Sequence, residues 1–293
     1  MIEVIVLFSL ATIWLIAGAA QDIKKQEVSN WTSLSLVLFA LGFRFFYCLF
    51  SEAGAAGTGA GFGFFYQGLI WFAIFFVLGN LLYSFRLFAG GDAKLFIALG
   101  AIVPLSAGFI SNVFYFLYFL TIFFFAGAVY GFAVSFFMVL KNFKEFKLQF
   151  KKRLGFMKNV IGVNVFFALF LMILGLSEWL FLFLGLIILI MPFLYIYAKA
   201  VDEACAVRLV SVNKIKEGDW LYEDVYLGKG KAKKGKRGKV VRAKWEGLSK
   251  KDIKLLQRRM KSKRIKIRYG IAFVPAMLFG WIAFMVFFLA TTV

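Results

Sequence analysis

The sequence contains no histidine, and this absence excludes several kinds of enzyme. Without His, the 293 residues can form no Ser-His-Asp triad, no Cys-His dyad and no His-ligated zinc site. The two cysteines, Cys48 and Cys205, are too few for an all-cysteine zinc site and lie far apart, so we expect them to be apolar residues or free thiols. We therefore expect no metal and no cofactor, and any enzymatic proton transfer must rely mainly on carboxylates, Lys or Tyr.

Acidic residues are scarce as well, whereas basic and apolar residues are abundant. The chain has 15 Asp and Glu against 35 Lys and Arg, a net charge of +20, and 62% of its residues are hydrophobic. An ordinary soluble domain is about 45–50% apolar, and disorder requires low hydrophobicity. The composition therefore indicates neither of these classes.

Apolar runs of about 20 residues, the length that spans a bilayer, recur along the chain. The runs that predict transmembrane helices cover residues 2–20, 31–50, 64–85, 92–110, 112–140, 159–176, 179–198 and 270–291. Pro104 interrupts the fourth run, and only a short break at Ser177 and Glu178 separates the sixth run from the seventh. Either region could instead be a re-entrant segment or a short hairpin. We therefore predict an all-α polytopic membrane protein with eight transmembrane helices, with six or seven as alternatives.

The distribution of basic residues supports this layout. Every Lys and Arg except Arg44 falls on one side of the predicted membrane, and for Arg44 we expect a side chain that snorkels outward. The opposite loops contain Glu52, Glu178 and the glycine-rich stretch 54–63, which does not fit the nucleotide-binding spacing and which we interpret as a flexible linker. By the positive-inside rule the basic side is cytoplasmic, which places the N-terminus outside the cell membrane.

These patterns divide the chain into four predicted parts. They are a transmembrane core at 1–140, a basic loop with further helices at 141–198, a basic cytoplasmic insert at 199–269 and a last helix at 270–293. Within the insert, residues 229–239 have the composition of a solvated, flexible tract. Ser249 and Asp252 predict a capping box that opens a helix. We expect the insert to be a small α+β or mainly helical unit.

The basic insert could contact nucleic acid or the membrane surface. No recognised nucleic-acid-binding motif is present in it. The inner leaflet of a membrane is anionic, and each Lys or Arg near such a surface contributes about 1 kcal/mol of attraction. We therefore expect anionic membrane lipid as the partner of the insert, and no nucleic acid.

Two aspartates stand at the predicted cytoplasmic boundary, Asp22 at the end of the first helix and Asp92 at the start of the fourth. Ionisable groups at a membrane span are costly and are candidates for function. Two neighbouring carboxyl groups can share one proton, so that one activates a water molecule while the other assists the oxyanion and the leaving amine. Because such a pair titrates as a unit, neither residue receives a fixed role. In the structural alternative, Asp22 pairs with Lys24 or Lys25 and Asp92 merely caps a helix.

Two motifs surround these aspartates. They read DIKKQEVSN at residues 22–30 and AGGDAKL at residues 89–95. Together they resemble the GxGD aspartyl proteases of the prepilin peptidase family, and most of all its archaeal preflagellin and prepilin peptidases. The resemblance is strongest over residues 1–140. The sequence departs from the pattern at Ala89, where glycine is expected, and at Ser29, where proline is usual.

The resemblance implies that Asp22 and Asp92 are the catalytic residues of a membrane aspartyl endopeptidase. It implies that the substrates are type IV pilin-like or archaellin precursors, whose short basic leader is removed at the cytoplasmic face. Bacterial relatives often carry a cysteine-rich zinc loop and a methyltransferase activity. Because such cysteines are absent here, we expect proteolysis only.

Further motif residues are candidates for supporting roles. They are Glu27, Asn30, Gly90, Gly91 and Lys94. The two glycines would let an extended substrate approach the carboxylates. Lys94 could bind a substrate carbonyl or tune Asp92, or it could serve as a cationic anchor at the interface. Glu27 could meet a basic residue of the leader, or pair with a neighbouring lysine.

Other functions remain open from sequence. An intramembrane protease resembling presenilin or signal peptide peptidase shares G-x-G-D, but Gln21 precedes Asp22 and residues 274–277 (VPAM) match its Pro-Ala-Leu motif poorly. A proton-coupled transporter would place its carboxylates near the bilayer midplane. A Ser/Lys protease using Lys94 with Ser29 or Ser84 would leave Asp22 unused. The sequence names neither the precursor nor the oligomeric state.

Overall fold

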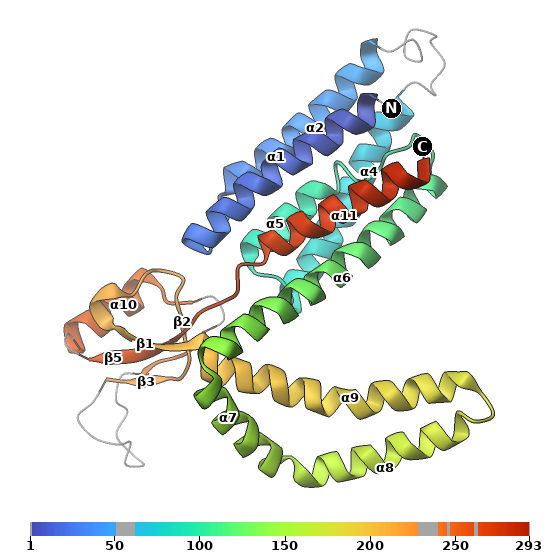
Figure 1. Cartoon of the computed structure of the whole chain (residues 1–293). Coiled ribbons are helices and arrows are strands. Elements are labelled where there is room, and N and C mark those ends of the chain that lie inside the picture. The colour runs from blue at the N-terminus through green and yellow to red at the C-terminus, as the bar shows by residue number, and fades with distance from the viewer. Residues whose placement is uncertain (1, 51–61, 228–239, 245–246, 261–262, 293) are drawn as a thin grey trace. The chain divides into compact units, whose positions relative to one another are not determined.

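The computed structural model describes residues 2–50, 62–227, 240–244, 247–260 and 263–292, and most of them are helical (Figure 1). The helices are α1 (Ile2–Lys25), α2 (Asn30–Phe50), α4 (Gly63–Ser84), α5 (Gly90–Leu99), α6 (Phe109–Lys141), α7 (Phe143–Phe156), α8 (Lys158–Leu174), α9 (Trp179–Val201), α10 (Lys250–Arg259) and α11 (Val274–Thr292). The strands are β1 (Val207–Ser211), β2 (Trp220–Leu221), β3 (Val225–Tyr226), β4 (Val240–Val241) and β5 (Arg264–Arg268). A π-helix, Asp202–Ala206, joins α9 to β1.

Six of the helices are long and apolar enough to cross a membrane, namely α1, α2, α4, α6, α9 and α11. A seventh span results if α7 and α8, which meet at a bend of 71°, count as one. The chain is thus an all-α polytopic membrane protein, as predicted, with six or seven candidate spans in its described part. The predicted range of six to eight transmembrane helices thus holds at its lower counts, and the preferred count of eight exceeds what the described residues contain.

The predicted span at 92–110 accounts for part of this difference. Its helix, α5, has only 10 residues and ends at Leu99, and residues 100–108 continue without a regular helix. The helix ends just before Gly100. This residue lies so close to α4 that a Cβ there would be 2.5 Å from the Cβ of Phe75. The predicted span at 159–176 accounts for the rest of the difference. Its helix, α8, has 17 residues and is long enough to cross a membrane only together with α7.

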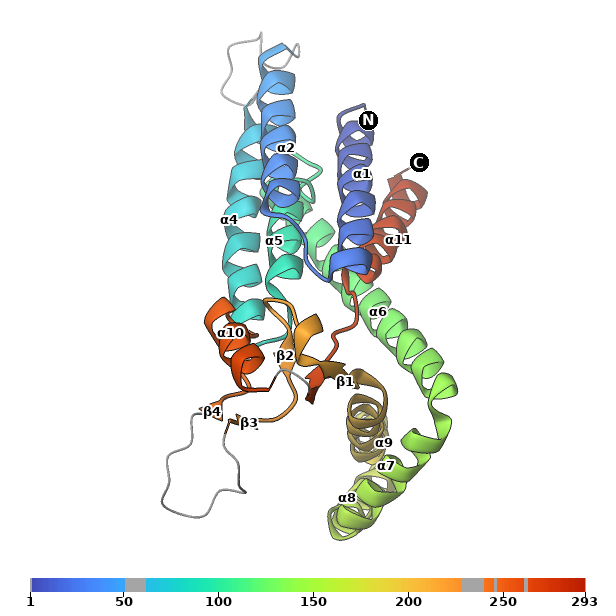
Figure 2. The same ribbon diagram turned by 90° about the vertical axis from the view of Figure 1, so that its left-hand side faces the viewer.

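The helices group into two compact units. The first contains residues 1–133 and 271–293, and the second contains residues 134–270. In the first unit, α1 packs against α2 and α11, and α5 packs against α2 and α4 (Figure 2). Aromatic side chains fill the core of this unit, and Phe75, Phe119 and Trp281 are fully buried there. Because aromatic rings bury large apolar areas, a phenylalanine-rich sequence is well suited to such packing.

Arg44 lies inside this first unit and does not reach outward. Its guanidinium donates hydrogen bonds to the carbonyl oxygens of Ala101 (2.8 Å), Phe64 (2.9 Å), Ile102 (3.2 Å) and Pro104. The predicted snorkelling of this side chain is therefore wrong. A non-helical segment at membrane depth needs partners for its free carbonyl groups, and Arg44 supplies them to the segment after α5.

The second unit contains the α8–α9 hairpin and the insert. The hairpin helices approach closely, because a Cβ on Gly185 would lie 2.8 Å from the carbonyl oxygen of Ala168. In the insert, β1, β5 and β2 form an antiparallel sheet in that order, and the side chain of Leu256 from α10 is buried in the adjoining apolar core. This arrangement agrees with the α+β alternative predicted for the insert. The capping box also exists, since Asp252 N donates to Ser249 Oγ (3.3 Å) and Ser249 N to Asp252 Oδ2 (3.3 Å).

Two sequence predictions concern residues that the structure does not describe. The glycine-rich linker falls at residues 54–63, of which 54–61 lie outside the described residues. The basic tract at 229–239 lies wholly outside them. Both stay predictions.

Candidate active site

Asp22 occupies the last turn of α1, and only 6% of its surface is exposed. Its Oδ2 accepts a hydrogen bond of 3.0 Å from the backbone N–H of Val274, the first residue of α11. The first N–H groups of a helix lack partners within the helix and carry partial positive charge, so they favour a carboxylate. Among the described residues no ion pair joins Asp22 to Lys24 or Lys25, as the structural alternative required.

Asp92 lies in the first turn of α5 and is likewise buried, with 8% of its surface exposed. Its Oδ2 accepts a hydrogen bond of 3.3 Å from the backbone N–H of Ala89, which precedes the helix. This is the helix cap that the structural alternative foresaw. A helix cap does not require full burial, since Asp252, which is only half-buried, makes the equivalent contact in α10. Asp92 therefore combines a cap with a position that shields its charge from water.

The two aspartates interact. Burial raises the pKa of Asp92, and the negative charge of Asp22 raises it further, to about 7, against the opposing effect of the Ala89 N–H. Helices α1 and α5 are in contact about one helical turn away from the two aspartates, because a Cβ on Gly18 of α1 would lie 2.9 Å from Leu95 Cδ1 of α5. A carboxyl group with such a pKa is partly protonated near neutrality, so the pair can hold a single proton.

The two sequence motifs also hold each other in place. Lys94 Nζ donates a hydrogen bond of 2.6 Å to Oδ1 of Asn30, at the start of α2. A Cβ on Gly91 would come within 3.1 Å of Val28 N and 3.3 Å of Val28 Cβ, so a larger residue there would push the two segments apart. Gly90 has more room, because a Cβ there would meet only Tyr83, at 3.8 Å. Asn30, Gly91 and Lys94 thus join the segments that carry Asp22 and Asp92.

The loop between α1 and α2 has a defined conformation. Gln26 adopts a φ of 55° and its N–H donates to the carbonyl oxygen of Asp22 at 2.7 Å, which ends α1. Ser29 stands where proline is usual, and its Oγ accepts a hydrogen bond of 3.4 Å from Thr32 N, as an N-cap of α2 does. Glu27 is exposed on this loop, and in the described part of the chain no ion pair joins it to a neighbouring lysine.

Sequence reasoning missed the contribution of α11 to this site. In the sequence, Val274 and Pro275 suggest only a poor match to a motif of another protease class. No sequence pattern near them indicates a contact with Asp22. Pro275 near the start of a helix is a typical first-turn proline and could have located the helix start. The contact with Asp22 itself depends on how α1 and α11 pack, which no local pattern encodes.

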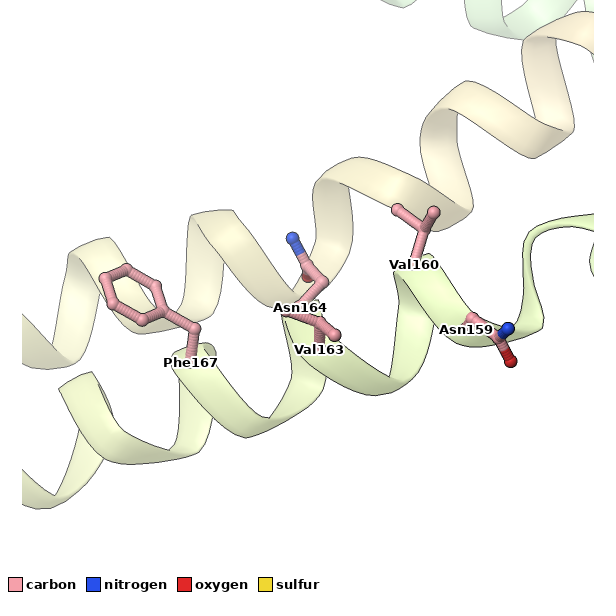
Figure 3. Close-up of a pocket in the computed structure, with 5 residues that line it drawn as sticks. All are labelled: Asn159, Val160, Val163, Asn164 and Phe167. Carbon is pink, nitrogen blue, oxygen red and sulfur yellow. The ribbon is translucent and has the colours of Figure 1, made fainter.

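A hollow on the surface of α8 lacks the chemistry of the aspartate site (Figure 3). It measures about 500 Å³ and is lined by Asn159, Val160, Val163, Asn164 and Phe167. Asn164 Oδ1 is buried there without a hydrogen-bond partner. The lining contains no carboxylate, amine or hydroxyl group that could catalyse hydrolysis. Elsewhere in the described residues, no group of three or more Cys, Asp and Glu is arranged to hold a metal ion.

Comparison with known proteins bears on the first unit. Residues 9–132 match the family model described as the type IV leader peptidase family. The matched range contains both Asp22 and Asp92, whereas α11 and the second unit lie wholly beyond it. No curated protein and no solved structure matches the chain.

Proposed function

We propose that this chain, whose residues 9–132 belong to the type IV leader peptidase family, is an aspartic endopeptidase that uses Asp22 and Asp92 as its catalytic pair. Its substrates are type IV pilin-like or archaellin precursors, from which it removes a short basic leader. The observation that carries the mechanism is the burial of two interacting carboxyl groups, each supplied by one of the two sequence motifs.

The surroundings of the two aspartates support different protonation states and therefore different catalytic roles. Burial disfavours the ionised form of Asp22, and the N–H at the start of α11 opposes this effect. The charge of Asp22 in turn favours the protonated form of Asp92. Asp22 takes a proton from a water molecule as the water oxygen attacks the peptide carbonyl. Asp92 donates a hydrogen bond to the developing oxyanion. The proton held by Asp22 then passes to the leaving amine, and the peptide C–N bond breaks.

The location of the site follows from the charge distribution. In this multi-pass membrane protein we place the active site and the basic insert on the cytoplasmic side and the N-terminus outside, because the loops near both aspartates are basic. Exposed Glu27 is suited to meet a basic residue of the leader. Anionic membrane lipid is the partner proposed for the insert, with no nucleic acid, no cofactor and no methyltransferase activity.

The test uses membranes that contain the full chain and a precursor with a basic leader followed by an apolar helix. Asp22→Asn and Asp92→Asn should each lower the rate of leader removal by about 100-fold or more, because each removes one proton-transfer group. Exposed Glu145 on α7 provides the control, and Glu145→Gln should cleave at the wild-type rate. Cleavage that survives both aspartate changes rules the mechanism out.

One observation favours the intramembrane alternative as a second candidate. The segment Val274–Met277 matches the Pro-Ala-Leu motif of presenilin-like proteases only poorly, but it begins at the carboxyl group of Asp22. The position of the cut separates the two functions, because a leader peptidase cuts before the apolar helix and an intramembrane protease cuts inside it. A chain that cleaves nothing but takes up a solute with protons is a transporter. The Ser/Lys alternative is disfavoured, since Lys94 binds Asn30 and Ser84 Oγ donates to its own helix at Asn80 O (2.8 Å).

A further inference from the structure

A basic groove follows the free edge of the sheet in the second unit. It encloses about 940 Å³ along β1 and the turn after it, next to β5. Its lining includes four exposed cations and no carboxylate. These cations are Arg208, Lys214, Lys216 and Arg264. We refer to these four residues as the groove cations.

Within the described residues the groove cations lack an acidic partner, whereas four other basic residues of this unit have one. Ion pairs join Arg153 to Glu203, Arg268 to Asp202, Lys266 to Glu223 and Lys250 to Glu217. No ion pair of this kind involves a groove cation in the described part of the chain. The fold thus neutralises several neighbouring cations and leaves four of them around one hollow, which suits an anionic ligand.

The guanidinium of one groove residue, Arg208, has a restrained orientation that suits phosphate binding. The guanidinium of Arg208 lies over the ring of Tyr269, 5.3 Å from its centroid. Stacking of this kind restrains the orientation of the guanidinium plane, whose parallel N–H groups match two oxygens of a phosphate. Lysines such as Lys214 and Lys216 add charge with less directional demand.

An apolar residue lies among these cations. Leu209 is 63% exposed, and it pairs with Lys266 in the register of β1 and β5, as Ser211 does with Arg264. Residues directly opposite in an antiparallel ladder share one face of the sheet, so Leu209 and Arg264 lie on the same face. Arg208, which precedes Leu209 in β1, belongs to the other face, so the groove passes around the free edge of β1 and is lined from both faces. A free phosphate or a nucleic-acid backbone gives an exposed leucine nothing to contact, whereas a lipid has both a phosphate and an acyl chain.

The chain also brings this groove close to the bilayer. The candidate span Trp179–Ala206 runs directly into β1, so Arg208 follows the end of the span by two residues. Basic side chains at such a boundary lie within reach of lipid headgroups.

We propose that this groove binds the phosphate-bearing headgroup of an anionic membrane lipid, with the groove cations around the phosphate and Leu209 against the start of an acyl chain. The inference deepens the lipid contact proposed for the insert and does not depend on peptidase activity. The fold thereby carries a specific lipid site in addition to its general basic charge.

The experiment measures lipid binding by the full chain in uncharged detergent. A fluorescent phosphatidylglycerol is titrated into wild-type protein, and a phosphatidylcholine with the same fluorophore serves as the uncharged-lipid comparison. The variant R208Q/K214Q/K216Q/R264Q should bind phosphatidylglycerol about tenfold or more weakly. The matched control is K251Q/K254Q/R258Q/R259Q, which removes the same charge from exposed positions on α10 and should stay within about threefold of wild type.

Each possible result of this experiment either supports or excludes the lipid site. Selective loss in the groove variant, with preference for phosphatidylglycerol over phosphatidylcholine, supports the site. Equal loss in both variants shows general electrostatic attraction and overturns it. Displacement of the lipid by inorganic phosphate at millimolar concentration also overturns it, because the ligand is then a free anion. Leader cleavage measured on the same samples reports on the proposed peptidase separately.

Discussion

At the scale of single residues, the two aspartates differ in where their backbone partners come from. Asp92 accepts the N–H of Ala89, which adjoins its own helix, whereas Asp22 accepts the N–H of Val274 from a helix far away in sequence. The first contact forms whenever α5 forms. The second requires α1 and α11 to be packed, so the electrostatic state of Asp22 depends on tertiary structure.

The raised pKa of Asp92 predicts the pH dependence of leader cleavage. The catalytic pair needs one proton, and this proton leaves as the pH rises through about 7, the pKa of Asp92. The value of kcat/KM for detergent-solubilised enzyme should therefore fall about tenfold per pH unit above that point. Glu145→Gln should give the same profile, and an activity that keeps rising to pH 9 would contradict the prediction.

The contact between Val274 and Asp22 can be removed without shortening a side chain at the site. Val274→Pro deletes the N–H donor, and proline is tolerated in the first turn of a helix. A hydrogen bond to a charged group contributes about 1.5–3 kcal/mol, so kcat should fall by about 10- to 100-fold with little change in KM. Val274→Ala keeps the N–H and should stay within about threefold of wild type. Equal activities of the two variants would exclude a role for this N–H.

At the scale of elements, the notable feature is that α5 is too short to cross a membrane. Its 10 residues end inside the first unit, and the segment that follows depends on the guanidinium of Arg44 for carbonyl partners. A short helix places Asp92 at one end of α5 and an irregular turn at the other. Arg44 therefore supports the element that carries one of the two aspartates, although it contacts neither of them.

This role of Arg44 predicts a large effect on stability. Arg44→Met leaves several buried carbonyl groups unpaired, each at a cost of about 1–3 kcal/mol, so the Tm in detergent should fall by roughly 10 °C or more. Arg44→Lys keeps the charge but not the planar set of donors and should lie in between. The exposed Arg258 serves as control, and Arg258→Met should melt like wild type. An unchanged Tm for Arg44→Met would show that water satisfies these carbonyls.

At the scale of the whole molecule, sequence predicted what local patterns encode. Six of the eight predicted spans, the capping box at Ser249 and the α+β alternative for the insert follow from apolar runs, helix signals and charge, and the structure has them. The re-entrant alternative for residues 92–110 allows a short α5, but its end at Leu99 and the burial of Arg44 were not predicted, because both depend on close packing between α2, α4 and the segment after α5. The Val274 contact was missed for the same reason.

The position of α11 in the chain has a consequence for biosynthesis. The ribosome makes the segments with Asp22 and Asp92 first, then the second unit, and only afterwards the residues from 271 onward. A nascent chain that has not reached Val274 holds both aspartates but lacks the amide that Asp22 accepts. Under the proposed function, hydrolysis at the full rate therefore requires that synthesis has passed the start of α11.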